Sequence, residues 1–429
     1  MLHDNIGINE KGRLTFAGAD TVELAREYGT PLYIMDEQRI RLRCRQYVET
    51  MRECMPEGSA PLFAGKALSF KGIYRIVCSE GMYIDAVSMG EIATALAAGA
   101  DPARIFFHGN NKTDAEIAYA IEKRVGHFIV DGFDELYAVD AAAAAAGVIQ
   151  PVLLRITPDI DPHTFEAVNT GRLDCQFGVG TDRAMHFLSE ALECEHLSVV
   201  GLHCHVGSQI FDAQPFLDSA RIMLGFLEDA LTMRGFIPEM LDLGGGFGVR
   251  YTEDDPQVDI PAEIRRIAEF VRAHARAKGL FEPAILLEPG RSIVADAGMT
   301  LYTVGQVKEI EGCRNYVSVD GGMSDNPRFA LYGSKYTVYP AGRMTEEADF
   351  ACTIAGRCCE SGALVAENVL LPRPVRGDTL AVAVTGAYNF SMSSNYNRVC
   401  RPPVVMINGG GTYVAVRRET PEDLMARDV

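Results

Sequence analysis

Eight short apolar runs, separated by stretches with a helical pattern, constrain the fold of this chain most strongly. The runs are residues 61–64, 82–87, 104–107, 127–130, 151–156, 199–204, 239–243 and 284–287. The helical stretches between them are residues 68–81, 90–99, 114–123, 134–146, 183–195, 216–233 and 262–278. Strands that alternate with helices are typical of parallel βαβ units, and eight strands close a barrel. The pattern therefore predicts a (β/α)8 barrel, with an open doubly wound sheet as the structural alternative.

The pattern changes after residue 291, where turn residues separate β-rich segments. The predicted strands here are residues 299–310, 315–319, 350–354, 379–384 and 413–417. We predict a second, all-β domain at residues 291–429, after a barrel domain at residues 35–290. The segment 1–34, with its apolar run 31–34, precedes the first barrel helix, predicted at residues 39–55, and is expected to join the β domain.

Composition restricts the class of protein further. The formal net charge is 40 − 58 = −18, which disfavours binding to the phosphates of a nucleic acid. The chain contains no apolar stretch long enough to span a bilayer, and its first residues lack a secretory pattern. Its 11 cysteines form no Cys-x-x-Cys pair, which argues against a structural zinc site. We expect a cytoplasmic enzyme that binds neither nucleic acid nor membrane.

Polar or glycine residues stand at, or just after, the ends of the predicted strands. They are Lys66, Ser88, His108, Asp131, Arg155, His205, Gly244 to Gly246 and Glu288. The active sites of such barrels lie at the carboxyl ends of the strands. The sequence therefore predicts that the chemistry lies at this end of the barrel.

Lys66 follows the first run, in Phe63-Ala-Gly-Lys66-Ala67. Burying an ammonium group at a strand end costs several kcal/mol unless the group is paired or neutralised. A lysine that loses its charge there is a nucleophile suited to a Schiff base with a carbonyl compound. The structural alternative is a lysine that extends its ammonium group into solvent.

His203 and His205 lie at the end of the sixth run and would share one face of a strand. They could form a metal site, place an imidazole against a flat cofactor ring, or form a hydrogen-bonded pair in the core. No acidic or cysteine ligand lies nearby at a matching spacing, so a metal ranks last and we predict none.

Gly244 to Gly246 follow the seventh run, and Glu288-Pro-Gly290-Arg291 follows the eighth. A glycine turn lets backbone N–H groups approach a phosphate, although a tight turn is the structural alternative. A buried carboxylate needs a cationic partner, and a protonated pyridine nitrogen would serve. Arg291 could bind a phosphate or a substrate carboxylate. A lysine, an imidazole, a phosphate turn and a carboxylate are together the groups that pyridoxal phosphate requires.

Seven segments resemble the barrel-type pyridoxal phosphate-dependent decarboxylases of basic amino acids. They are residues 63–67, 85–91, 203–209, 244–246, 288–291, 359–362 and 386–388. The resemblance implies that Lys66 carries pyridoxal 5'-phosphate, that His205 stacks on its ring and that Glu288 pairs with its pyridine nitrogen. The phosphate would be held by, or lie beside, Ser208, Gly245, Gly246, Gly290, Arg291 and Tyr388.

The resemblance also implies a homodimer with active sites at the interface. Cys359 would donate a proton to the carbanion, and Glu360 would bind the distal ammonium of the substrate. Arg291, Arg328 and Tyr332, beside Tyr388, resemble a clamp for a distal carboxylate.

These features imply decarboxylation of meso-2,6-diaminopimelate to L-lysine and carbon dioxide. The alternatives are a decarboxylase of ornithine, arginine or carboxynorspermidine, an amino acid racemase on the same scaffold, and a catalytically inactive regulatory relative. Glu360-Ser-Gly362 favours diaminopimelate over ornithine, for which the similar enzymes carry Cys-Asp-Gly. The chain departs from the usual family pattern at Leu68, Asp131, Gln176 and Ala363.

Overall fold

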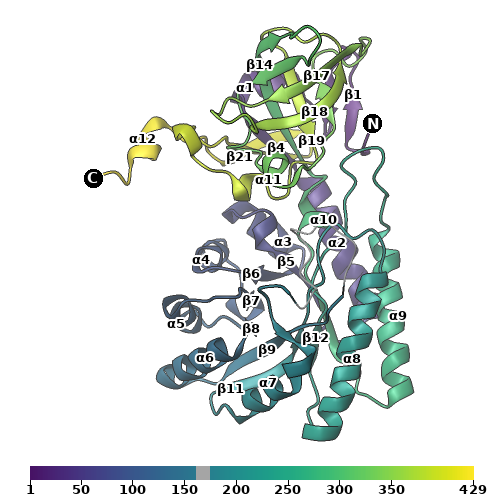
Figure 1. The fold of residues 1–429 in the computed structure, drawn as a ribbon, viewed down its shortest axis with the longest axis vertical. Helices are drawn as coiled ribbons and strands as arrows, with labels where there is room; N and C mark the ends of the chain where they lie inside the picture. Colours follow the sequence, from purple (N-terminus) through teal and green to yellow (C-terminus); the bar gives the residue numbers. More distant parts are fainter. Residues whose placement is uncertain (161–173) are drawn as a thin grey trace. The chain divides into compact units, whose positions relative to one another are not determined.

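Eight parallel strands close into a barrel in the computed structural model, which describes residues 1–160 and 174–429 (Figure 1). In order around the barrel they are β5 (Ala60–Ala64), β6 (Tyr83–Ala86), β7 (Ile105–Phe107), β8 (His127–Val130), β9 (Gln150–Thr157), β11 (Leu197–His203), β12 (Met240–Asp242) and β13 (Ala284–Leu287). Pairing of β8 with β9 and of β13 with β5 closes the ring. The short β10 (Val179–Gly180) adds to β9. The predicted barrel is confirmed, and the open sheet is excluded because both ends of the sheet are paired.

Helices alternate with the strands along the barrel. They are α3 (Lys71–Ser79), α4 (Met89–Ala97), α5 (Asp114–Glu122), α6 (Phe133–Ala146), α7 (Thr181–Glu193), α8 (Gln214–Arg234) and α9 (Ile260–Lys278). Their ends follow local chemistry. The side chain of Asp259 accepts a hydrogen bond from the N–H of Ala262 at the start of α9, and Gly279 ends that helix in the left-handed conformation, at φ 64°.

The barrel interior is a packed apolar core. Side chains from alternate positions of the strands meet there, namely Ala60, Leu62, Phe106, Ile129, Leu153, Val200 and Leu286, with Tyr83 and Met240 packed against them. Residues 60–64 of β5 are buried throughout, as expected for a parallel strand covered on both faces. The strand ends that carry the polar side chains are therefore supported by a tightly packed core.

A second sheet contains strands from both ends of the chain. Its order is β18 (Leu364–Leu371), β17 (Phe350–Ala355), β15 (Tyr316–Val319), β14 (Gly298–Lys308), β4 (Leu32–Asp36), β20 (Val404–Asn408) and β21 (Gly411–Val416). Off this path, β19 (Thr379–Ala383) pairs with β14, and β16 (Val338–Pro340) pairs with β19. The N-terminal segment supplies β4, which confirms that it completes the β domain.

Smaller elements complete this part of the chain. They are the antiparallel β1 (Ile6–Ile8), β2 (Leu14–Phe16) and β3 (Ala19–Asp20), with α1 (Thr21–Tyr28), α11 (Arg328–Tyr332) and α12 (Pro421–Met425). The linking helices are α2 (Glu37–Cys54) and α10 (Arg291–Val294). Across the described residues, no helix has both the length and the apolar character needed to cross a membrane.

Contacts divide the chain into two units. Unit 1 is Met1–Ile40, Val249–Pro256 and Ile293–Val429, and unit 2, the barrel, is Arg41–Gly248 and Gln257–Ser292. The predicted site residues divide between these units, so each group is described within its own unit.

Candidate active site

Lys66 lies in η1 (Gly65–Ala67), a single 3-10 turn directly after β5. Of the two placements left open by the sequence, the structure has the one in which the side chain extends outward: Lys66 is exposed, although Gly65 and Ala67 on either side are buried. The turn carries the lysine past the buried strand. Burial raises the pKa values of Asp85, Glu91 and Glu288, and the positive charge of Lys66 lowers all three in part. Lys66 therefore lies within electrostatic reach of the acidic residues at the barrel mouth.

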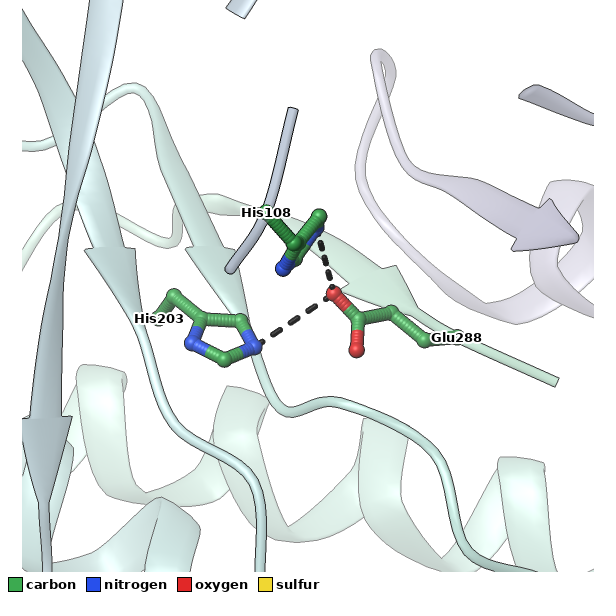
Figure 2. Close-up of side chains that lie close together, drawn as sticks. All are labelled: His108, His203 and Glu288. Carbon is green, nitrogen blue, oxygen red and sulfur yellow. Dashed lines mark ion pairs between the residues drawn. The ribbon is translucent and has the colours of Figure 1, made fainter. Parts of the chain in front are cut away.

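Glu288, directly after β13, is buried between two histidines from other strands (Figure 2). Its Oε1 lies 3.1 Å from Nε2 of His108, which follows β7, and 3.4 Å from Nε2 of His203, the last residue of β11. Nε2 of His108 also lies 3.7 Å from Oδ1 of Asp85. The distances are those of ion pairs, but Glu288 Oε1 and both Nε2 atoms form no hydrogen bond within the described residues.

These three side chains could hold a metal ion, because their ligand atoms lie within 4.8 Å of one another. Sequence spacing alone therefore overlooked this set, and the prediction of no metal stays a prediction. An acidic partner for His203 is missing nearby in the sequence, but the barrel brings Glu288 and His108 to it from distant strands.

Burial controls the charge of this cluster. It lowers the pKa of His108 and of His203 well below the usual value, and the cationic side chain of Arg155 adds to both shifts. The two imidazoles are therefore neutral near pH 7. Burial, and then the nearby charge of Glu288, raise the pKa of Asp242 well above its usual value. A hydrogen bond with Asp242 favours the ionised form of Glu288, so Asp242 is the protonated partner.

His205 lies beyond the end of β11 and is half-buried. Its Nδ1 accepts a hydrogen bond from the backbone N–H of Gly245 at 3.2 Å, which assigns the ring proton of the neutral form to Nε2. Burial lowers the pKa of His205 well below the usual value, and the charge of Lys66 lowers it further. The ring is thus fixed in one tautomer beside the glycine turn.

The glycine turn after β12 leaves no room for side chains. A Cβ at Gly245 would lie 2.0 Å from the carbonyl oxygen of Glu288, and one at Gly246 would lie 2.3 Å from that of Gly207. Gly246 also has φ +133°. A Cβ at Gly290 would lie 3.0 Å from the Cβ atoms of Ala64 and Ala67. The loops after β5, β11, β12 and β13 therefore approach one another at backbone distance.

Arg291, at the start of α10, is buried and donates a hydrogen bond from Nη2 to Oγ of Ser208 at 2.9 Å. A guanidinium group and a hydroxyl thus lie together beside the glycine turn. Both are groups that bind phosphate well.

Arg155 and Asp131 were noted at strand ends but given no role. Arg155 is buried, with Nη1 3.6 Å from Oδ1 of Asp131 and its guanidinium 4.6 Å from the ring centroid of Phe177. Asp131 also accepts a hydrogen bond from the N–H of Gly178 at 2.9 Å.

Ser88, another strand-end candidate, caps α4 by accepting a hydrogen bond from the N–H of Glu91 at 3.2 Å. Sequence reasoning assigned no role to Asp85, His108 and Asp242 and left that of His203 open, although each stands at or next to a strand end.

In unit 1, Arg328 opens α11 and is buried. Its guanidinium carbon lies 5.4 Å from the ring centroid of Tyr332 and 5.3 Å from that of Tyr388. Nη2 donates to Oγ of Ser334 at 3.4 Å, whereas Nε has no hydrogen-bond partner among the described residues. The structure thus brings Arg328 and Tyr332 of the predicted carboxylate clamp together with Tyr388, whereas Arg291 belongs to unit 2.

Cys359 and Glu360, also in unit 1, are exposed, whereas Cys358 is buried. The backbone N–H of Cys359 donates to Oδ1 of Asn397 at 3.0 Å, and Oε1 of Glu360 accepts from the hydroxyl of Tyr396 at 2.6 Å. As predicted, the thiol of Cys359 is accessible and the thiol of Cys358 is packed in the interior.

Comparisons with known proteins agree with this arrangement. Residues 38–295 match the family model described as pyridoxal-dependent decarboxylase, pyridoxal binding domain. The chain is 42% identical to diaminopimelate decarboxylase of Bacillus subtilis (strain 168) over 434 residues, covering 100% of this chain and 98% of that protein. It is 39% identical to the enzyme of the same name from Mycobacterium tuberculosis (strain ATCC 25618 / H37Rv), covering 98% and 96%. The crystal structure of diaminopimelate decarboxylase from M. jannaschii in co-complex with L-lysine is similar at a TM-score of 0.92 and 34% identity, covering 100% and 99%.

Proposed function

Because this chain belongs to the pyridoxal-dependent decarboxylases, we propose that it converts meso-2,6-diaminopimelate to L-lysine and carbon dioxide. The observation that carries this proposal is the 42% identity to diaminopimelate decarboxylase of Bacillus subtilis across the whole chain. The co-complex of a similar enzyme with L-lysine is consistent with lysine as the product.

The residues of unit 2 fit pyridoxal phosphate, the cofactor of this family. Glu288 has a buried carboxylate oxygen without a hydrogen bond in the described residues, and a pyridine N–H would satisfy it. Gly245 and Gly246 form a turn that carries no side chains, which lets a phosphate approach the backbone closely. When bound, the cofactor supplies a conjugated ring that accepts the electron pair left by departing carbon dioxide.

Each residue has a defined task in this proposal. Lys66 tethers the cofactor through its amine, and His205 covers one face of the ring. Glu288 keeps the pyridine nitrogen protonated. The phosphate is bound or approached by Ser208, Gly245, Gly246, Gly290, Arg291 and Tyr388.

The reaction breaks one bond and needs one proton. The bond between the α-carbon and its carboxylate breaks, carbon dioxide leaves, and the remaining electron pair takes a proton at the α-carbon. Cys359 is the proposed donor, and the exposure of its side chain supports access to substrate. Cys358 is buried and is assigned only packing.

The distal end of the substrate explains the choice of amino acid. Diaminopimelate carries a second carboxylate, and Arg328 offers a buried guanidinium between Tyr332 and Tyr388 whose Nε has no hydrogen-bond partner in the described residues. Ornithine and arginine lack that carboxylate and would leave the cation unpaired, which costs affinity. Glu360 is proposed to bind the distal ammonium.

Release of carbon dioxide from a panel of amino acids tests the substrate. We expect meso-2,6-diaminopimelate to be decarboxylated far faster than ornithine, arginine or carboxynorspermidine. Preference for ornithine would replace this proposal with a diamine-forming decarboxylase. Absence of turnover with every compound, in protein that binds pyridoxal phosphate, would favour a regulatory relative.

We also propose a cytoplasmic homodimer whose active sites combine residues of both subunits, and a subunit-mixing experiment tests the dimer. Lys66→Ala and Cys359→Ala proteins should each be inactive. Mixing them should restore activity, because a heterodimer would contain one intact site. Cys358→Ala is the matched control and should keep most activity. No recovery after confirmed subunit exchange would argue against a shared site.

A further inference from the structure

Three buried polar atoms from the ends of three strands meet at the barrel mouth. They are Oε1 of Glu288 and the Nε2 atoms of His108 and His203, at 3.1 Å and 3.4 Å from that oxygen (Figure 2). Strands β7, β11 and β13 are not neighbours in the sheet, so the side chains meet across the barrel interior. The imidazole rings lie 5.2 Å apart at an interplanar angle of 75°, and each therefore approaches the carboxylate from its own direction.

Fold stability does not explain this arrangement. Within the described residues none of the three atoms makes a hydrogen bond, and buried polar groups left in this way destabilise a protein. Apolar side chains at positions 108 and 203 would avoid that cost. Hydrogen bonds in an empty catalytic site are often poorly aligned and tighten when the reacting molecule binds. The cluster therefore fits a group that completes it on binding.

The charges around Glu288 indicate what the histidines contribute. Asp85, Asp131 and Asp242 are acidic neighbours of this cluster, and Lys66, Lys112 and Arg155 are cations that act on it. Burial keeps both imidazoles neutral by lowering their pKa values. A neutral imidazole can offer one N–H to the carboxylate without cancelling its negative charge. A lysine or arginine at the same place would pair with that charge and weaken its attraction for a protonated pyridine.

We propose that His108 and His203 are positioning residues that hold the carboxylate of Glu288 toward the pyridine nitrogen of the cofactor while leaving its negative charge intact. This inference rests on the proposed function only for the identity of the cofactor. Neither histidine is assigned a contact with the reacting atoms.

Cofactor binding to the full-length protein, freed of pyridoxal phosphate, tests the inference without any substrate. The dissociation constants of pyridoxal phosphate and of its 1-deaza analogue, in which carbon replaces the pyridine nitrogen, are measured for wild type, His108→Leu and His203→Leu. We expect each variant to weaken binding of pyridoxal phosphate about tenfold or more, the loss typical of one hydrogen bond to a charged group. Binding of the 1-deaza analogue should change less than about threefold.

Conservative and control variants separate positioning from packing. His203→Gln carries an amide N–H at about the reach of imidazole Nε2 and should recover most of the affinity. His127→Leu removes a histidine at the first residue of β8, stacked on Phe106 at 4.3 Å, and should leave both dissociation constants unchanged. In a Glu288→Gln background, the leucine variants should cause no further loss, because their effect acts through that carboxylate.

Several results would overturn the inference. Equal losses for both compounds would assign the histidines to packing, and unchanged binding of pyridoxal phosphate would remove their role. Additive losses in the Glu288→Gln background would do the same. Tight binding of Zn²⁺ that competes with pyridoxal phosphate would assign the three atoms to a metal instead. A leucine variant that does not fold would be replaced by the methionine variant at the same position, which also lacks an N–H, in the same double-mutant test. The substrate panel could fail while pyridoxal phosphate and its 1-deaza analogue still differ as predicted. That result would revise the substrate and leave this inference intact.

Discussion

Gly245→Ala tests how closely the loops of the barrel mouth depend on one another. The added Cβ would lie 2.0 Å from the carbonyl oxygen of Glu288. Relief to 3.4 Å, the start of ordinary van der Waals contact, requires a backbone shift of 3.4 − 2.0 = 1.4 Å. The obstructing atom belongs to the backbone, so no side-chain rotation can remove the clash. Either the glycine turn or the loop that carries Glu288 must move.

Two consequences follow from a shift of this size. Overpacking a buried position costs about 1–3 kcal/mol of unfolding free energy, which lowers the Tm by roughly 2–4 °C for each kcal/mol in a domain of this size. A displacement of about 1 Å at an active site lowers the rate on the order of 10²-fold. We therefore expect Gly245→Ala to lose activity far out of proportion to its loss of stability.

The assays are thermal unfolding, the dissociation constant of pyridoxal phosphate, and initial rates of carbon dioxide release. Gly132→Ala is the matched control in the same unit, because a Cβ there would meet no atom within 4 Å and the backbone is extended. Its Tm and rate should match those of wild type. A Gly245→Ala protein with wild-type rate and wild-type cofactor affinity would refute the reasoning.

Four further changes give separate tests. Lys66→Ala should abolish carbon dioxide release and the visible absorption of bound cofactor, because the tethering amine is lost; near-normal turnover would contradict its role. Arg328→Met should lower kcat/KM for diaminopimelate roughly 30-fold or more, since losing one partner of a buried charged pair costs about 2–5 kcal/mol, while absorption of the cofactor stays unchanged. Burial raises the pKa of Glu91 to about 7, so the folded state holds this proton more tightly than the unfolded state, and the free energy of unfolding should fall as the pH rises toward 7. Urea titrations should show a weaker fall for Glu91→Gln, and equal slopes would remove Glu91 as the source. Gly225→Ala, inside α8 with no atom within 4 Å of an added Cβ, should raise stability by about 0.5–1 kcal/mol in thermal unfolding.

Much of the barrel is predictable because its strands carry a strong local signal. Residues 127–130 and 284–287 were predicted with the bounds of β8 and β13, since buried parallel strands are continuously apolar and turn residues flank them. The β domain gave a weaker signal. β18 contains Glu367 and Asn368 at its centre, and its pairing with β17 shifts register, so no clean alternation marks it as a strand.

The site was predictable only as far as the strand ends define it. The strand-end rule identified Glu288 and His108 as candidates, but their contact depends on which strands lie across the barrel. Three residues on β7, β11 and β13 are adjacent only in the closed ring. The exposure of Lys66 was not predictable either, because a single 3-10 turn decides it. The assigned roles of the site residues stay predictions until the variants above are measured.

The position of β4 has a consequence for synthesis on the ribosome. β4 pairs with β14 on one side and with β20 on the other. Tyr33 faces Val404 in that pairing, a separation of 404 − 33 = 371 residues. Translation proceeds from the amino end, so this early strand must wait until almost the whole polypeptide has emerged before its sheet can form.

The barrel segment is complete much sooner and can fold first, as domains do during synthesis. In a nascent chain halted before residue 404, the edge of β4 that pairs with β20 would lack its partner, and such open edges promote aggregation. The first residues to be synthesised can therefore complete their sheet only after the C-terminal strands have been made.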